Sequence, residues 1–573
     1  MNYLDEYRKW LNSGALTESE KKELTDADDA DLQSRFHGYL QFGTAGLRGI
    51  MGAGTNRMNV HVVRHATQAF AEVILGEGEK AKNAGVAVCF DCRNNSREFA
   101  SAAACVLAAN GIHVRLFESL RPTPELSFAV RQYGCIAGIN VTASHNPKEY
   151  NGYKVYWSDG AQLPPHHAAA IAAKMAEIDL FRDIKTETFD KAVSDGMITF
   201  LGRETDELFL ENVLAQASDR QAIAAVEDTF KLVYTPFHGT GYKLIPEMLK
   251  RLGLWHLYCV PEQMVIDGNF PTVASPNPEN PEGFALAVKL ADKVGADLIL
   301  GSDPDADRIG ILVRNPEGAF VPMTGNQVGV LMLDYVILSK MKAGTMPEKP
   351  AALKSIVTTE MAAKVAETNG IANYNTFTGF KFMAEKKNQL EESGAGKVIF
   401  SFEESYGYMV GDYVRDKDAV TAALVITEMA ASYAGRGMTL YDAMQELYRK
   451  YGYYGEKTLN LVMPGLDGLE KMRKLMTGLR ESPLTEIAGS GVLVRRDYAD
   501  GVSTCVKTGK TEKMELSGSD VLGYDLSDGT KVIVRPSGTE PKIKVYVLTS
   551  GKDAEDCGAR TRKYAEWAGS LSR

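Results

Sequence analysis

The chain has no stretch typical of a leader or a membrane anchor. Residues 1–9 contain several charged side chains and lack the apolar core of a signal peptide. No uncharged apolar run reaches the roughly 20 residues of a spanning helix. Long basic tracts are also missing, and the formal net charge is −10. We therefore expect neither nucleic acid nor a membrane as partner, and we expect a cytoplasmic protein.

Cysteine is scarce as well. Seven cysteines are scattered along 573 residues, an odd number that does not make a disulfide framework. Cys89 and Cys92 have the spacing of a redox or zinc pair, but no second pair or nearby histidine cluster completes a tetrahedral site. We expect reduced thiols and a structural role for this pair at a strand end.

Low-complexity segments and letter-by-letter repeats are absent too, but a strand–helix–strand rhythm recurs. The apolar run 86–90 precedes an alanine-rich helical segment at 98–110 and a second apolar run at 112–117, which is the pattern of a βαβ unit. The rhythm returns twice, with strands or helices expected at 231–234, 241–252, 298–300, 356–358, 361–368 and 398–402. Three α/β layers are therefore predicted.

The expected pattern of strands and helices changes after about residue 452. Strand-like runs at 458–462, 531–535 and 543–548 and a closing helix at 554–567 suggest a smaller α+β domain. With 45% hydrophobic residues the chain can fill several cores. We predict an α/β protein of three consecutive α/β domains with mixed sheets plus a C-terminal α+β domain. The expected boundaries are 1–202, 203–318, 319–451 and 452–573.

Ser144 lies in a conspicuous turn. The run 142–147, Thr-Ala-Ser-His-Asn-Pro, follows a short buried strand and ends it at Asn-Pro. A hydroxyl at the end of a strand faces the crevice where α/β folds bind ligands. A serine hydrolase is one alternative, but Gly-x-Ser-x-Gly is missing. We also expect the neighbouring His145 to point away from the hydroxyl on an extended segment.

The loop 303–308, Asp-Pro-Asp-Ala-Asp-Arg, follows an apolar strand. Its alternating carboxylates allow three oxygens to converge on one hard cation, which suits Mg²⁺, with Mn²⁺ possible, better than zinc. An EF-hand would need glycine at Arg308 and glutamate at Arg314. An acidic solvated turn is the plainer alternative. A phosphatase with an aspartate nucleophile is another, although Ser144 would then have no role.

Further polar loops follow apolar strands. Residues 535–542, Arg-Pro-Ser-Gly-Thr-Glu-Pro-Lys, offer a guanidinium, hydroxyls and backbone N–H groups suited to phosphate, although a plain hairpin turn explains the glycine and prolines. Residues 402–407, Phe-Glu-Glu-Ser-Tyr-Gly, present groups suited to sugar hydroxyls, but a helix cap explains them as well. The segments 42–48, 378–381 and 415–418 are individually weaker signals.

Together these loops resemble the α-D-phosphohexomutase family, which includes phosphoglucomutases and phosphomannomutases. The motifs match in family order at 142–147, 303–308, 403–407 and 535–539, with further matches at 42–48 and 151–154. The stretches 42–49 and 148–157 resemble its longer subgroup, which includes phosphopentomutases and a glucose-1,6-bisphosphate synthase. The resemblance implies four domains around a central cleft.

The resemblance also implies residue roles. Ser144 would hold the transferable phosphoryl group, and its phosphate would share one Mg²⁺ per active site with Asp303, Asp305 and Asp307. Charge stabilisation or proton transfer would fall to Arg48, His145, Lys154 and Lys417, with Lys417 expected as general base. The substrate-binding residues would be Arg308, Thr378, Gly379, Lys381, Glu403, Ser405, Arg535, Ser537, Gly538 and Thr539.

The activity implied is that of an intramolecular phosphotransferase. It would interconvert hexose 1-phosphate and hexose 6-phosphate, glucose first, through a phosphoserine and a sugar bisphosphate, with a sugar 1,6-bisphosphate as activator. Phosphopentomutase or phosphomannomutase activity on the same scaffold is the main alternative. A sugar-bisphosphate synthase, a phosphatase and a non-catalytic sugar-phosphate sensor are further ones. The sequence leaves the preferred sugar, the oligomeric state and the regulation open.

Overall fold

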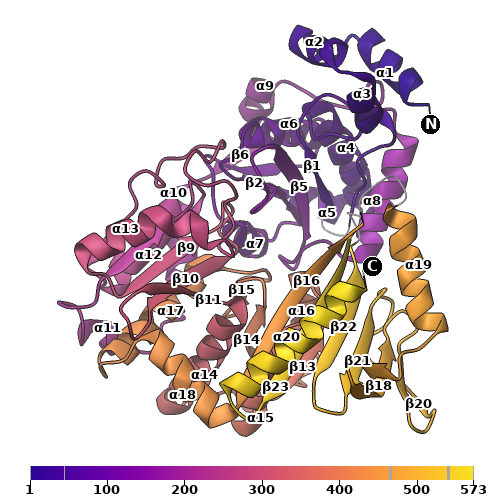
Figure 1. Ribbon diagram of the computed structural model, residues 1–573. Coiled ribbons are helices and arrows are strands. Elements are labelled where there is room, and N and C mark those ends of the chain that lie inside the picture. Colours follow the sequence, from indigo (N-terminus) through magenta and orange to yellow (C-terminus); the bar gives the residue numbers. More distant parts are fainter. Residues whose placement is uncertain (1, 44–45, 464–467, 538–541, 572–573) are drawn as a thin grey trace.

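The computed structural model describes residues 2–571 apart from 44–45, 464–467 and 538–541. Four sheets follow one another along the chain, and helices pack on each of them (Figure 1). Each sheet together with its helices is called a unit, numbered from the first to the fourth along the chain. The first three sheets mix parallel and antiparallel pairs, whereas the fourth is antiparallel. The predicted fold class is therefore confirmed.

Three short helices precede the first sheet: α1 (Tyr3–Asn12), α2 (Glu18–Asp26) and α3 (Asp29–Phe36). They form the outermost part of the molecule at the top of Figure 1. Trp10 anchors them, since its ring is buried among the rings of Phe36, His61 and Phe181.

The first sheet has the order β1-β5-β4-β2-β3-β6, and only β5 runs in the opposite direction to the other strands. Its strands are β1 (Gly46–Ile50), β2 (Val86–Phe90), β3 (Val114–Phe117), β4 (Ala137–Val141), β5 (Tyr150–Trp157) and β6 (Ile198–Leu201). Its helices are α4 (Val60–Gly76), α5 (Glu79–Ala84), α6 (Ser96–Ala109), α7 (Thr123–Gln132), α8 (Pro165–Glu177) and α9 (Phe189–Ser194).

Strand β2 shows why this sheet is covered on both faces. All five of its side chains are buried, as expected for a central parallel strand. Val86 and Val88 share a core with α4 and α6, whereas Ala87 and Cys89 share one with α7. Alternate side chains thus face opposite layers, which gives a helix–sheet–helix sandwich.

The second sheet has the order β11-β10-β9-β7-β8. Its elements are α10 (Arg203–Leu214), α11 (Arg220–Ala224), β7 (Leu232–Thr235), α12 (Gly241–Leu252), β8 (Leu257–Cys259), a 3-10 turn (Pro281–Phe284), α13 (Ala285–Val294), β9 (Leu298–Ser302), β10 (Ile309–Arg314) and β11 (Phe320–Met323). Strand β11 pairs with β10, so this sheet extends to Met323.

The third sheet has the order β13-β12-β14-β15. Its elements are α14 (Gly325–Ala343), β12 (Pro350–Ser355), α15 (Glu360–Thr368), β13 (Ala372–Thr376), α16 (Phe380–Glu392), β14 (Lys397–Glu403), β15 (Gly407–Met409), α17 (Ala419–Ala434) and α18 (Leu440–Tyr451). Helix α17 also packs on β9 and β10, and one hydrophobic core runs through the second and third units.

One strand lies elsewhere than predicted. Residues 356–358 were expected in a strand, but β12 ends at Ser355 and they form the turn after it. Lys354 interrupts the apolar pattern of β12 although its side chain is fully buried. Its ammonium donates to the carbonyl of Thr358 at 3.0 Å and to Glu360 Oε1 at 2.9 Å, which allows a charge inside the strand.

The fourth unit has an antiparallel sheet of order β16-β23-β22-β21-β18-β19-β20, with β17 paired to β18. Its elements are β16 (Tyr453–Val462), α19 (Gly468–Glu481), β17 (Glu486–Ile487), β18 (Ser490–Asp497), β19 (Val502–Cys505), β20 (Thr511–Lys513), β21 (Leu522–Leu526), β22 (Lys531–Pro536), β23 (Lys542–Gly551) and α20 (Ala554–Ser570). Within the described residues, no helix is both long and apolar enough to cross a membrane.

Candidate active site

Ser144 occupies a strained turn, three residues beyond the end of β4. Its φ is +52°, a left-handed conformation that non-glycine residues rarely adopt and that often marks functional sites. The Ser144 amide donates to Thr142 Oγ1 at 2.8 Å, which closes the turn. The turn directs Ser144 Oγ to Asp303 Oδ2, 2.8 Å away in the second unit.

The expectation for His145 was wrong. Its Nδ1 lies 3.1 Å from Ser144 Oγ, because the left-handed turn replaces the extended segment that the sequence suggested. Burial and the positive charges of Arg308 and Arg48 hold the pKa of His145 well below its usual range. The imidazole is therefore neutral near pH 7, and its Nδ1–H can donate to Ser144 Oγ, because the serine proton is used in the hydrogen bond to Asp303.

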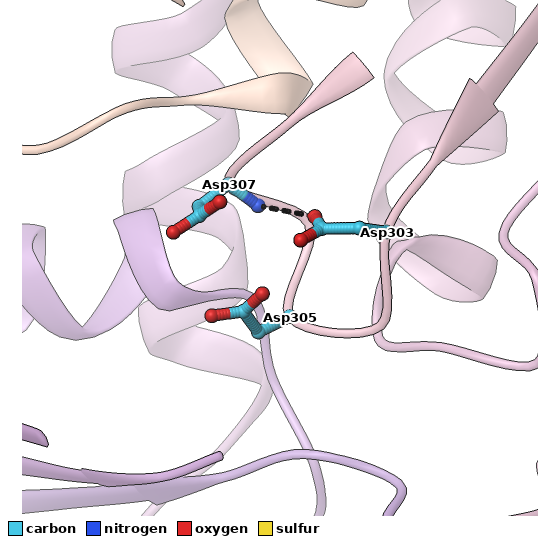
Figure 2. A group of neighbouring side chains, drawn as sticks. All are labelled: Asp303, Asp305 and Asp307. Atoms are coloured by element: carbon cyan, nitrogen blue, oxygen red, sulfur yellow. Dashed lines mark hydrogen bonds between the residues drawn. The ribbon is translucent and has the colours of Figure 1, made fainter. Parts of the chain in front are cut away.

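Asp303, Asp305 and Asp307 lie together in the loop between β9 and β10. Their ligand oxygens lie within 4.8 Å of one another, and all three side chains are buried. Figure 2 shows the carboxylates around one small space, where the amide of Asp307 donates to Asp303 Oδ1 at 3.2 Å. Within the part of the chain that the structure describes, no group donates a hydrogen bond to the Oδ1 atom of Asp305 or Asp307.

These residues fit a hard divalent cation. Burial, together with repulsion from Asp305 and Asp307, raises the pKa of Asp303 well above its usual range. A bound cation would offset that repulsion and satisfy the unpaired carboxylate oxygens. The donors are oxygens only, which matches Mg²⁺ or Mn²⁺ and does not match a zinc site.

Two lysines from other units reach the same carboxylates. Lys154 Nζ of β5 lies 2.7 Å from Asp305 Oδ2, and Lys417 Nζ lies 3.0 Å from Asp307 Oδ2. Burial alone would lower the pKa of Lys417, but Asp307 and Asp416 outweigh it and raise that pKa. The ammonium form is therefore favoured, which argues against the expected role of Lys417 as general base.

Several supporting residues had little or no signal in the sequence. Thr123 at the start of α7 donates through Oγ1 to Asp305 Oδ2 and through its amide to the Asp305 carbonyl, both at 2.8 Å. Asn140 of β4 donates to Thr123 Oγ1 at 2.7 Å. Asp416, which lies in the weaker signal at 415–418, is fully buried and accepts from Tyr156 at 2.8 Å. Only the packing of separate units brings these groups to the metal loop, which is the loop of residues 303–308 that carries the three carboxylates.

A cavity of about 480 Å³ lies between the third and fourth units. Residues that line it include Gln162, Thr378, Gly379, Lys381, Arg473, Arg535 and Ser537. Among the described residues, the buried Lys381 ammonium has no hydrogen-bond partner, and burial lowers its pKa. An unpaired cation next to a guanidinium and a hydroxyl suits an anionic ligand. The predicted residues Gly538 and Thr539 lie outside the described part of the chain.

The cavity and the carboxylates are neighbours. Gln162 lines the cavity and donates to Asp416 at 3.0 Å, while Asp416 also pairs with Lys417 at 3.3 Å. Glu403 at the end of β14 accepts from the Gly379 amide at 2.5 Å. Burial, with repulsion from Glu404, raises the pKa of Glu403 to about 7.

The remaining predicted residues lie around this centre. Arg308 pairs with Glu279 at 3.3 Å, and its backbone bridges to Gly407 beside the half-buried Ser405. Arg48 on β1 is exposed and donates to Asn146 Oδ1 at 3.2 Å. The structure thus brings Ser144, the carboxylates and the two lysines into direct contact, with the cavity alongside.

Four segments of this chain match the four domains of one known protein family. Residues 39–182, 207–318 and 324–451 match alpha/beta/alpha domains I, II and III of phosphoglucomutase/phosphomannomutase, and residues 493–559 match the C-terminal domain of that family. These matches cover most of the chain. The N-terminal helices and α19 lie outside the matched segments.

Two phosphoglucomutases are similar to this chain over most of its length. The chain is 34% identical over 538 residues to a phosphoglucomutase of Staphylococcus saprophyticus, covering 94% of this chain and 95% of that protein. It is 35% identical over 540 residues to one of Staphylococcus aureus, covering 92% and 93%.

Two solved structures share the fold. Paramecium parafusin, a phosphoglucomutase in its open form, has a TM-score of 0.67 at 19% identity, covering 93% of this chain and 94% of that chain. A Burkholderia thailandensis protein of the phosphoglucomutase/phosphomannomutase family has a TM-score of 0.65 at 18% identity, covering 92% and 97%. The four matched domains and the relatives show that this chain belongs to the phosphoglucomutase/phosphomannomutase family.

Proposed function

We propose that this protein is a phosphohexomutase that interconverts hexose 1-phosphate and hexose 6-phosphate, with glucose as the preferred sugar. One observation carries the proposal: the Ser144 hydroxyl donates to Asp303, within a buried group of three carboxylates suited to a divalent cation. A hydroxyl in that position is suited to carrying a phosphoryl group. The relatives named phosphoglucomutase support glucose as the sugar.

The proposed reaction has two phosphoryl transfers. In the first, the bond between phosphorus and Ser144 Oγ breaks and a bond to the free hydroxyl of the sugar monophosphate forms, which gives a sugar bisphosphate. After the bisphosphate turns end for end, its other phosphate returns to Ser144. The hydroxyl proton of the sugar passes to a base in the first transfer and is returned from it in the second. His145 is the proposed base, because its imidazole is neutral whereas the ammonium form of Lys417 is favoured. A sugar 1,6-bisphosphate is the proposed activator, because loss of the intermediate leaves the serine unphosphorylated.

Charge neutralisation is the main task of the protein in such a transfer. Asp303, Asp305 and Asp307 are the proposed ligands of Mg²⁺, which would supply positive charge opposite the phosphoryl oxygens. Lys154 and Lys417 are held beside these carboxylates as cations. We propose that both stabilise the transferring group, together with Arg48 and Arg308.

We propose that the cavity between the third and fourth units binds the phosphate that does not react. Lys381 and Arg535 supply positive charge, and Thr378 and Ser537 supply hydroxyls. The proposed set also includes Gly538 and Thr539. Glu403 and Ser405 are proposed to bind the sugar hydroxyls between the two phosphate sites.

An assay of three substrates tests the function. Glucose, mannose and ribose 1-phosphates are compared, each with its bisphosphate and Mg²⁺, and the isomerised product and free phosphate are both measured. We expect the highest kcat/KM with glucose 1-phosphate and no net phosphate release. A higher kcat/KM with ribose 1-phosphate would favour a phosphopentomutase, and phosphate release without isomerisation would favour a phosphatase.

The boundaries 1–202, 203–318, 319–451 and 452–573 remain our proposed division of the chain, although β11 pairs with β10 and extends the second sheet beyond residue 318. A cytoplasmic location is also proposed. All seven cysteines are free, which suits a reducing compartment.

A further inference from the structure

The buried guanidinium of Arg93 contacts the backbone of the Ser144 turn. Arg93, in the loop between β2 and α6, is only 3% exposed. Its Nη2 donates to the carbonyls of Ser144 at 2.6 Å and Asn146 at 2.5 Å. Its Nη1 donates to the carbonyls of Pro147 at 2.9 Å and Tyr150 at 3.0 Å. One side chain therefore holds four carbonyls of the segment that presents the nucleophile.

The guanidinium is itself fixed from several sides. Arg93 Nε lies 3.3 Å from Asp91 Oδ2, and the same carboxylate accepts from Thr142 Oγ1 at 2.6 Å and from Ser96 Oγ at 2.7 Å. The ring of Phe270, from the second unit, lies 5.1 Å from the guanidinium carbon. Asp91 thus ties Arg93 to Thr142, the residue that closes the Ser144 turn.

We propose that Arg93, oriented by Asp91, is a positioning residue that holds Ser144 in its left-handed conformation and so aims its Oγ at the metal loop. The inference rests on the proposed role of Ser144. A backbone at φ +52° persists only where its surroundings enforce it. The planar guanidinium suits this task, because its donors diverge in fixed directions whereas an ammonium is a compact point donor.

A purely structural role makes a different prediction. If Arg93 only filled space in the first unit, its replacement would lower stability without a specific effect on phosphoryl transfer. If it positions Ser144, the transfer step slows while the cavity, built mainly from the third and fourth units, still binds sugar phosphate. Separate measurements of transfer and binding distinguish the two.

The test variant is Arg93→Lys, which keeps the positive charge but loses the planar fork. Phosphorylation of Ser144 by glucose 1,6-bisphosphate is followed in single turnovers by intact-protein mass spectrometry. We expect its rate to fall about a hundredfold, as misplacement of a reacting group predicts. Calorimetric binding of glucose 1-phosphate should stay within about threefold of the unaltered protein. Hydrogen exchange across residues 142–151 should become faster.

Arg314→Lys is the matched control. Arg314 also donates to two carbonyls, those of Ala296 at 2.9 Å and Gly318 at 2.6 Å, and it lies over the ring of Phe320 at 4.1 Å. It lies at the end of β10, apart from the Ser144 turn, so its variant should transfer phosphate normally. Equal losses in both variants would overturn the proposal.

Other outcomes are equally decisive. Transfer at the normal rate with unchanged exchange at 142–151 in Arg93→Lys would also overturn the inference. If that variant does not fold, Asp91→Asn replaces it, since it keeps the arginine and weakens the carboxylate contacts to Arg93 and Thr142, and a slower transfer is again expected. If the unaltered protein never gains phosphate on Ser144, the proposed function fails, while the exchange data still decide whether Arg93 holds the turn.

Discussion

At the scale of single residues, the site concentrates charge where solvent is excluded. Asp303, Asp305 and Asp307 are almost fully buried, and the cations that face them come from other parts of the chain. Buried carboxylates this close together repel unless cations compensate. Metal affinity should therefore depend on each carboxylate separately.

Asp305→Asn tests that dependence. The amide keeps the size of the side chain but removes a negative charge from the cation site, so Mg²⁺ or Mn²⁺ affinity should fall by about a hundredfold. Isothermal titration calorimetry of the metal measures it directly, and turnover should fall by orders of magnitude in parallel. Asp195→Asn, on an exposed pair with Lys191, is the control. Equal metal affinity in Asp305→Asn would exclude this cluster as the metal site.

Glu403 should make stability depend on pH. Because its pKa is raised from 4.5 to about 7 in the folded protein, folding favours the protonated acid. The stability it contributes is complete below about pH 4.5 and is lost as pH rises through about 7, up to roughly 3 kcal/mol. Melting temperatures across this range should fall more in the unaltered protein than in Glu403→Gln. Parallel curves would contradict the assignment.

The sequence predicted residues of this site unequally. Ser144 and the three aspartates were recognisable because each follows an apolar strand in a short polar motif. Arg93 and Thr123 were not, because their partners lie far away in the chain and no local pattern reveals a buried polar contact. Asp416 was named only as part of the weak signal at 415–418. The orientation of His145 was mispredicted since the left-handed φ of Ser144 has no sequence signal.

At the scale of elements, apolar periodicity was sufficient where strands are uniformly apolar. Strand β2 and helix α12 lie at the predicted residues, 86–90 and 241–252. Strand β12 was missed because its buried Lys354 breaks the pattern. The three N-terminal helices carry mostly polar residues and pack through a few large side chains, so their dependence on Trp10 emerges only from the structure.

Trp10→Ala tests this packing. Removing a ring that is 1% exposed should cost about 3–5 kcal/mol and release the N-terminal helices from the first unit. Hydrogen exchange across 3–36 and the melting temperature measure the loss. The control Trp255→Ala removes a ring that is 70% exposed and should have little effect. Equal effects of the two variants would contradict the anchoring role of Trp10.

At the scale of the whole molecule, the site exists only where the units meet. The metal loop of the second unit is contacted by Ser144 and Lys154 from the first and by Lys417 from the third. The cavity needs walls from the third and fourth units. The sequence predicted the four units and their motifs but not this assembly, because contacts between units depend on surfaces rather than on local periodicity.

Lys531 links the last two units and should therefore affect substrate binding. Its ammonium lies 2.8 Å from Glu360 Oε2 across the interface, and both side chains line a smaller cavity that shares Ile356 with the larger one. Lys531→Ala should raise KM for the sugar phosphate about fivefold, the factor that corresponds to ~1 kcal/mol, with little change in kcat. Lys510→Ala, on an exposed pair within the fourth unit, should leave KM unchanged. A loss of kcat at constant KM would contradict this view of the interface.

The central claim is that Ser144 carries the phosphoryl group. The most direct measurement is peptide mapping by mass spectrometry after incubation with glucose 1,6-bisphosphate and Mg²⁺, together with a coupled mutase assay. We predict one phosphate, on Ser144, in the unaltered protein, and neither phosphate nor turnover in a folded Ser144→Ala variant. Phosphate on another residue, or near-normal turnover in Ser144→Ala, would contradict the claim.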